Sequence, residues 1–406
     1  MNIVSISGGV CAPKGFSAGG VHCGIRSNQN KKDLGEVISD KIASAAAVYT
    51  QNKVFGAPIA VTKKNIANGM AKAMICNSGI ANTCAVDGIQ TATEMCDLVE
   101  KYMNVPSSDV IVASTGVIGV SLPMDKINSG MKDLSSQVTY DGGDNFSNAI
   151  MTTDTFNKQI AVEFDLNGTI CRIGGTAKGS GMINPNMATM LSFITTDVAI
   201  DPNMLSKALT FVANESFNML CVDGDTSTND MLCIMANGMA ENDVISDEND
   251  DYKTFVSALN QVCVSLTKML ARDGEGATKM LVCNISGAPD KQTAKILAKS
   301  VISSSLLKAA MFGKDANWGR ILCALGYADA QFNINLVDVV LRSKAGSIAV
   351  CKNGSGIVFD EDNAFKILSE EEIYFDINLN QGDANSTAWG CDLTYDYVKI
   401  NGDYRS

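Results

Sequence analysis

The sequence of 406 residues contains a single histidine, His22, and this scarcity limits the chemistry that the chain can perform. A Ser-His-Asp triad, a Cys-His pair or a metal site with several histidines would each have to include that one residue. His22 lies among small and apolar residues in AGGVHCGIRS, a setting more typical of a core or loop histidine than of a catalytic one. If the chain performs acid–base chemistry near neutral pH, we expect its base to be another group.

Several other features are missing from the sequence. Thirteen cysteines occur without any C-x-x-C spacing, which argues against a disulfide scaffold and favours a reduced, cytoplasmic setting. We expect no signal peptide, because no basic stretch is followed by an apolar run near the start, and no membrane span, because no segment approaches ~20 apolar residues. The net charge is −12 and Lys and Arg do not cluster, so we expect no nucleic-acid surface.

Glycines gather in GGTAKGSG at 174–181, and the context of this segment argues against a nucleotide-binding loop. A Walker A motif requires Lys after its last Gly, whereas Ser180 follows Gly179 here. A dinucleotide-binding motif requires a helix after the glycines, whereas Pro185 and a strand-like run follow here. We therefore expect no nucleotide cofactor, and a structural turn is the alternative interpretation of the glycines. We expect no metal either, because Val244 and Ile245 interrupt the acidic tract ENDVISDENDDY at 241–252, which is typical of a solvated loop.

Apolar periodicity and turn residues predict a chain of mixed α and β structure. Helices are predicted at 91–103, 201–216, 252–274 and 292–313, and strands at 108–115, 158–166, 190–200, 231–239, 279–287 and 332–343. The helix at 201–216 opens with Asp201 as a candidate N-cap and Pro202 in its first turn. The Gly/Pro turn SGAPDKQ at 286–292 suggests a boundary between a larger domain, 1–286, and a smaller α+β domain, 287–406.

Ala188 and Thr189 stand where the glycine-rich segment and Pro185 lead into the strand predicted at 190–200. If the bond between them is cut, Thr189 gains a free α-amine, with a reference pKa of ~7.7–8.0, beside its own hydroxyl. One residue would then supply both nucleophile and base, without a histidine. The hydroxyl could make the cut itself by attacking the Ala188 carbonyl, with the glycines and Pro185 holding the peptide in a strained geometry. From the residues alone, a plain loop-to-strand junction is the favoured interpretation, because Ala-Thr pairs are common.

Further motifs follow one another along the whole chain: GVCAPKGFSAGGVHCGIRS (9–27), NSGIANTC (77–84), ASTGVIG (113–119), MTTDTFNK (151–158), VDGDTSTNDM (222–231), DGEGATK (273–279), DANWGRILCALGYA (315–328) and WGCDLTYDYVKINGDYRS (389–406). Together with GGTAKGSGMINPNMATMLSFITTD at 174–197, they resemble the ornithine acetyltransferases (glutamate N-acetyltransferases) of arginine biosynthesis. The segment at 174–197 is similar to the self-cleavage site of that family. Order and coverage match the whole family architecture, with no missing or extra domain.

The resemblance implies a role for each matching residue. Thr189 would be the nucleophile, released by self-cleavage after Ala188, and Thr115 and Gly116 would form the oxyanion pair. The residues that would contact substrate are Thr155, Lys178, Thr189, Glu275, Asn401 and Ser406. Without the resemblance, Gly116 also fits a turn glycine, and Lys178 and Glu275 also fit surface charges. Asn401 and Ser406 also fit a frayed carboxyl-terminal tail.

The resemblance also implies a mechanism and a fold. Acetyl would move from N-acetylornithine to glutamate by ping-pong chemistry on Thr189 without a resident cofactor, and the use of acetyl-CoA as a second donor is left open. The larger part would be a four-layer α/β/β/α sandwich similar to N-terminal-nucleophile enzymes, followed by a smaller C-terminal α+β domain. The cleaved chains, 1–188 and 189–406, would stay associated, assembling as α2β2. A self-cleaving aminopeptidase or amidase, or an uncut amino-acid-binding protein, are the alternatives.

Overall fold

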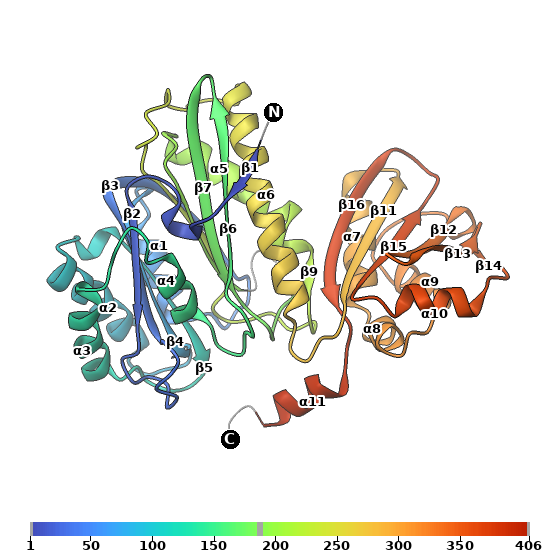
Figure 1. The fold of residues 1–406 in the computed structure, drawn as a ribbon, viewed down its shortest axis with the longest axis horizontal. Coiled ribbons are helices and arrows are strands. Elements are labelled where there is room, and N and C mark those ends of the chain that lie inside the picture. The colour runs from blue at the N-terminus through green and yellow to red at the C-terminus, as the bar shows by residue number, and fades with distance from the viewer. Residues whose placement is uncertain (1–2, 185–189, 404–406) are drawn as a thin grey trace. The chain divides into compact units, whose positions relative to one another are not determined.

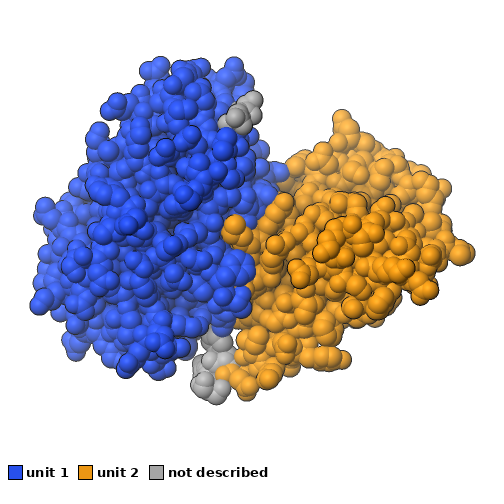
Figure 2. Space-filling model, viewed as in Figure 1, with its two compact units in different colours: residues 1–179, 185–218, 226–266 blue, residues 180–184, 219–225, 267–406 orange. Residues whose placement is uncertain are grey.

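The computed structural model describes residues 3–184 and 190–403 (Figure 1). These residues form two compact units, coloured separately in Figure 2. The first comprises 3–179, 190–218 and 226–266, and the second comprises 180–184, 219–225 and 267–403. The main division therefore falls after 266 rather than after 286, because β11 (Met280–Ala288), which precedes the Gly/Pro turn, pairs with strands of the second unit. Two short segments from the middle of the chain also belong to that unit.

A nine-stranded sheet is the frame of the first unit, in the order β1-β6-β7-β8-β10-β3-β4-β5, with β2 also paired to β3. Its strands are β1 (Val4–Ile6), β2 (Phe16–Val21), β3 (Leu34–Tyr49), β4 (Met70–Ile80), β5 (Val110–Val117), β6 (Lys158–Leu166), β7 (Thr169–Lys178), β8 (Leu191–Thr196) and β10 (Met231–Ala236). The first half of β3 pairs with β2 and its second half pairs with β10, while β4 pairs with the first half and, after a shift, with Ala43 and Ser44. A register shift between Ile38 and Ala43 separates the two halves, so one strand serves two β layers.

Helices cover the outer face of each β layer (Figure 1). Helices α1 (Ala57–Asn65), α2 (Gly88–Met103) and α3 (Met124–Ser135) cover β2, β4 and β5, while α5 (Pro202–Glu215) and α6 (Asp250–Arg272) cover the other layer. Alternation along β4 divides the core, because Ala73 and Ile75 face the helices whereas Met74 and Cys76 face the opposite β layer. Within that inner core, Phe146 of α4 (Gly143–Ile150) meets Phe193 of β8 edge-on at 5.1 Å. The expected α/β/β/α sandwich is confirmed.

The second unit is a smaller α+β assembly built on a seven-stranded sheet in the order β14-β13-β12-β15-β11-β16-β9. The remaining strands are β9 (Leu220–Cys221), β12 (Asp338–Ser343), β13 (Gly346–Lys352), β14 (Ser355–Gly356), β15 (Glu372–Asn378) and β16 (Ala384–Cys391). The helices are α7 (Lys291–Ser303), α8 (Ser305–Phe312), α9 (Trp318–Gly326), α10 (Glu361–Leu368) and α11 (Tyr395–Gly402). Short 3-10 turns occupy Gly9–Cys11, Ser107–Asp109, Phe217–Met219 and Ile334–Leu336.

The structure confirms one helix signal in the sequence and contradicts another. Asp201 caps α5 as predicted, because its carboxylate accepts hydrogen bonds from the Asn203 and Met204 N–H groups. The single helix predicted at 292–313 is wrong, since Ser304 is extended (φ −72°, ψ 107°) and its hydroxyl caps a new helix, α8. Nothing in the apolar periodicity marks that break. Within the described ranges no helix is both long and apolar enough to cross a membrane.

One buried carboxyl group stands out in the first unit. Glu36 of β3 is fully buried, pairing with Ile75 of β4 and Gly19 of β2. Neither of its carboxyl oxygens has a hydrogen-bond partner among the described residues. Burial raises the pKa of Glu36 to about 8, so the folded protein holds a proton there at neutral pH.

Replacing Glu36 should change how stability depends on pH. Between about pH 4.5 and 8 the folded chain retains a proton that the unfolded chain releases, so the free energy of unfolding falls by ~1.4 kcal/mol per pH unit. Glu36→Gln removes this dependence, and its stability relative to wild type should rise steadily over that range in urea titrations. Glu94→Gln on α2 is the control and should leave the wild-type slope unchanged. The prediction would be contradicted if the free energy of unfolding of Glu36→Gln fell with pH in parallel with that of wild type.

Candidate active site

Lys178, the last residue of β7, connects the two β layers of the first unit. It pairs with Leu191 of β8, whose side chain belongs to the inner core. The Lys178 Nζ donates a hydrogen bond of 3.3 Å to the Thr115 hydroxyl of β5, which lies in the opposite layer. Burial lowers the pKa of Lys178, and the nearby Asp154 carboxylate opposes that effect. A buried amine and a hydroxyl therefore meet at the end of the sheet where β8 begins.

Gly116, next to Thr115, is fixed by a close approach of two strands. Its φ is +133°, a conformation that side chains disfavour, and an added Cβ would lie 2.2 Å from the Gly79 carbonyl carbon. The β4–β5 pairing also shifts register between Gly79 and Ile80. Asn229 links the same two strands, donating hydrogen bonds to the backbone carbonyls of Ala81, which follows β4, and Ser114 of β5. The backbone around Thr115 and Gly116 is therefore set by neighbouring strands and by one buried amide.

A carboxylate and a second lysine accompany Lys178. Asp154 lies 2.6 Å from the fully buried Lys158 ammonium and accepts the Gly179 N–H at 2.7 Å. Burial alone would raise the pKa of Asp154, but the ammonium groups of Lys178 and Lys158 outweigh it and lower that pKa to about 2. The carboxylate is therefore ionised, and it partly balances two buried cations.

Asp230, at the start of β10, is a second buried acid near Lys178. Burial raises its pKa well above the ordinary range, against opposing hydrogen bonds from Ser227 and the charge of Lys178. The adjacent Met231 N–H bonds to the Met190 carbonyl, so Asp230 stands beside the first residue that the structure describes after 184. Sequence reasoning did not single out Asp154, Lys158 or Asp230, although all three lie inside motifs that carried the family resemblance.

The second unit brings together two other predicted residues. Glu275 is buried and accepts a hydrogen bond of 2.8 Å from the side-chain amide of Asn401 on α11. Its backbone N–H bonds to the Ser180 carbonyl. A Cβ on Gly181 would lie 2.2 Å from the Glu275 carboxylate, so the glycine leaves room for that group. Glu275 is therefore a positioned buried carboxylate rather than a surface charge.

The predicted residues thus form two groups, one in each unit. Thr155 is exposed and directly follows Asp154. Ala188, Thr189 and Ser406 lie outside the described residues, and the assigned roles stay predictions. His22 Nδ1 lies 2.9 Å from the Lys31 carbonyl and 3.3 Å from the Asp33 carboxylate, contacts that suit a structural histidine.

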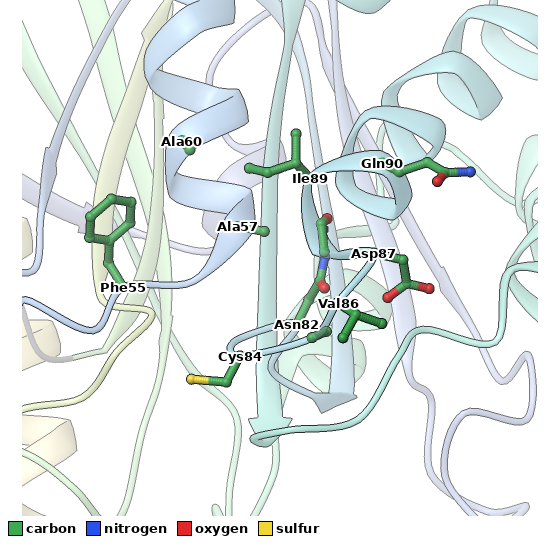
Figure 3. Close-up of a pocket in the computed structure, with 11 residues that line it drawn as sticks. Phe55, Ala57, Ala60, Asn82, Cys84, Val86, Asp87, Ile89 and Gln90 are labelled. Atoms are coloured by element: carbon green, nitrogen blue, oxygen red, sulfur yellow. Dashed lines mark hydrogen bonds between the residues drawn. The ribbon is translucent and has the colours of Figure 1, made fainter.

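A surface pocket of about 330 Å³ lies elsewhere in the first unit (Figure 3). It is formed at the starts of α1 and α2, and its lining residues are Phe55, Ala57, Ala60, Asn82, Cys84, Ala85, Val86, Asp87, Gly88, Ile89 and Gln90. None of the predicted site residues lines it. This pocket is therefore separate from the contact between Lys178 and Thr115.

The model of the ArgJ family matches residues 17–406. The arginine biosynthesis bifunctional protein ArgJ of Caldanaerobacter subterraneus is 45% identical over 402 residues, which cover 99% of each chain. The chain belongs to the ArgJ family. The resemblance drawn from the motifs is confirmed, and with it an enzyme of arginine biosynthesis.

Solved structures of ArgJ-family proteins are also similar to this chain. The arginine biosynthesis bifunctional protein from Bacillus halodurans is 44% identical, with a TM-score of 0.49, covering 52% of this chain and 97% of that one. An ornithine acetyltransferase from Mycobacterium tuberculosis, described in complex with ornithine, is 34% identical, with a TM-score of 0.43, covering 46% of this chain and 100% of that one.

Two glycines of ASTGVIG allow a matched test of the close approach at Gly116. Gly116 and Gly119 both have positive φ, but an added Cβ meets the Gly79 backbone at the first and nothing within 4 Å at the second. Gly119→Ala should cost ~1–2 kcal/mol from backbone strain alone. Gly116→Ala should cost about 1–3 kcal/mol more, because the strands must separate. Urea unfolding of both variants measures the difference, and equal losses would show that the strands separate freely.

Proposed function

We propose that this ArgJ-family enzyme transfers acetyl from N-acetylornithine to glutamate through an acetyl ester on Thr189. The observation that carries the proposal is the contact between the buried Lys178 and the half-buried Thr115 hydroxyl, at the end of the sheet where β8 begins. This contact places a hydroxyl donor, a cation and a constrained glycine backbone together. Such groups stabilise the negative charge that develops on the carbonyl oxygen during acyl transfer. Family membership supports the reaction class.

The proposed transfer has two balanced half-reactions. In the first, the Thr189 hydroxyl loses its proton to its own α-amine and attacks the acetyl carbonyl; the amide C–N bond then breaks, and ornithine leaves with that proton. In the second, the neutral α-amine of glutamate attacks the ester carbonyl and gives a proton to the Thr189 α-amine; the acyl C–O bond breaks, the Thr189 oxygen takes that proton back, and N-acetylglutamate departs. The Thr115 hydroxyl and the Gly116 N–H stabilise both oxyanions. The chemistry needs no metal or resident cofactor, and acetyl-CoA is a second donor that the same ester accommodates.

Two buried charged side chains, Lys178 and Glu275, suit parts of an amino-acid substrate. Lys178 supplies a buried cation for the α-carboxylate that both substrates share. Thr155, a further proposed contact, directly follows Asp154, whose carboxylate acts on the charge of Lys178. Glu275, held by Asn401, supplies a buried carboxylate for a substrate amine, and Ser406 adds a further contact. A carboxylate that is already oriented loses little freedom when it binds a cation, which favours tight recognition.

Self-cleavage at Ala188–Thr189 generates the α-amine that the mechanism uses. The Thr189 hydroxyl attacks the Ala188 carbonyl, the peptide C–N bond breaks to leave an ester, and water hydrolyses that ester to a carboxylate. The fragments stay together because β8, from 189–406, pairs with β7, from 1–188, and β10 pairs with β3. Separation would break both ladders and expose the inner core, so we propose an associated αβ pair that assembles further as α2β2.

The intact mass of the purified protein tests the cleavage. Wild type should consist of residues 1–188 and 189–406, Thr189→Ala should remain a single inactive chain, and Thr189→Ser should still be cut because it keeps a hydroxyl. The activity readout is transfer of labelled acetyl from N-acetylornithine, or in a parallel reaction from acetyl-CoA, to glutamate. Label appearing only in acetate would identify a hydrolase, and an intact wild-type chain that binds amino acids without turnover would identify a binding protein.

Substitution of Thr115 tests the oxyanion role. Thr115→Val keeps the shape but removes the hydroxyl, and it should lower kcat by about 10²-fold and slow cleavage, because both reactions pass through an oxyanion. His22→Gln is the control and should retain most activity, since the α-amine of Thr189 acts as the base. Steady-state kinetics and a time course of cleavage measure both. Wild-type rates for Thr115→Val, or loss of turnover in a folded, cleaved His22→Gln protein, would contradict the mechanism.

A further inference from the structure

The turn at 222–225, within the motif VDGDTSTNDM, lies beside the segment 180–184 in the second unit. The Val222 N–H bonds to the Ile183 carbonyl at 2.7 Å, and the Asn184 side-chain amide bonds to the Gly224 carbonyl at 3.0 Å. Residues 182–184 therefore run along this turn in a fixed register. They are the last described residues before the Ala188–Thr189 bond.

The Asp223 side chain makes the central contacts of this arrangement. Its carboxylate accepts the N–H groups of Met182 at 2.6 Å, Ile183 at 2.9 Å and Asp225 at 3.2 Å. Three backbone donors thus converge on one carboxylate, and hydrogen bonds to a charged acceptor are stronger than neutral ones.

The hydrogen bond from the Met182 N–H to Asp223 fixes a residue with an unfavourable backbone conformation. Its φ is +56°, in the left-handed region, which costs a residue with a side chain ~1–2 kcal/mol. Ser180, two residues earlier, is fixed by its hydroxyl on the Asp273 carbonyl and by its own carbonyl on the Glu275 N–H. With Ser180 anchored, the conformation of Met182 sets the direction in which the chain continues.

We propose that Asp223 is a positioning residue for self-cleavage. By fixing Met182 and Ile183, its carboxylate restricts the conformations of the chain that leads to the Ala188–Thr189 bond, and we expect this restriction to favour attack of the Thr189 hydroxyl on the Ala188 carbonyl. Alignment of this kind supplies a large part of the rate of an intramolecular attack. The inference rests on the cleavage in the proposed function and adds a residue that acts through the backbone without touching the reacting atoms.

The carboxyl-terminal helix contributes to the same arrangement. The Tyr397 hydroxyl of α11 donates a hydrogen bond of 3.3 Å to Asp223. Burial and the Asp223 charge raise the pKa of Tyr397, so it stays a neutral donor. Because Met182 and Ile183 use shorter bonds to the same carboxylate, loss of the Tyr397 hydroxyl should matter less than loss of the Asp223 charge.

The test follows cleavage of the newly made full-length chain in cell-free translation with labelled methionine. Asp223→Asn keeps the size of the side chain but replaces one acceptor oxygen with an amide NH2, and we expect its cleavage rate constant to fall at least ~10-fold. Asp225→Asn, in the same turn, is the matched control and should cut at the wild-type rate. Tyr397→Phe should cut within a few-fold of wild type. If Asp223→Asn does not fold, Asp223→Ser, which keeps an oxygen acceptor, replaces it and should also slow cleavage.

Two further measurements separate positioning from general destabilisation. After prolonged incubation, the fraction of Asp223→Asn that has been cut should show a kcat within ~3-fold of wild type, and its Tm should lie within a few degrees. Equal losses in cleavage rate, kcat and Tm would overturn the positioning role. Cleavage of Asp223→Asn at the wild-type rate would overturn it as well while leaving the proposed function intact. A wild-type chain that never cuts would overturn the proposed function and this inference with it.

Discussion

One strand, β3, carries the hydrogen bonds that join the two β layers of the first unit. It pairs with β2 before its register shift and with β10 after it, while β4 pairs with it on both sides of the shift, so the sheet continues from one layer to the other. The inner core forms between the layers that this strand connects. The contact between Lys178 and Thr115 depends on the same geometry, because β7 and β5 are far apart along the sheet and meet only across the core.

That contact brings charge into a region that is otherwise apolar. Lys178 and Lys158 are buried with Asp154, and Asp230 lies close by. Removing ions from water is costly, and well-packed apolar residues would often be at least as stable in their place. Buried groups with shifted pKa values are common where chemistry requires a charge of defined position. The cluster therefore fits a catalytic requirement better than a structural one.

The sequence predicted some parts of this molecule well, for reasons that are local. Asp201 before Pro202 is a complete capping signal, and the strand at 158–166 coincides with β6. The break at Ser304 escaped detection because apolar residues continue on both sides of it. The motifs identified the family, but the contact of Asp154 with Gly179, 25 residues along the chain, depends on where strands lie in space. A two-residue strand such as β9 has too few positions to show any periodicity.

The origin of β9 also affects how the protein is made. Leu220, Cys221 and Val222 are almost completely buried in the second unit, and β9 pairs there with Trp389 and Gly390 of β16. A ribosome adding ~5–20 residues per second reaches β16 about 170 residues after β9, which is ~10–30 s later. Throughout that interval the edge strand has no partner, although the last strand of the first unit, β10, is complete only about 15 residues after β9. The nascent chain therefore carries an unpaired apolar segment that a chaperone must shield or the growing polypeptide must tolerate.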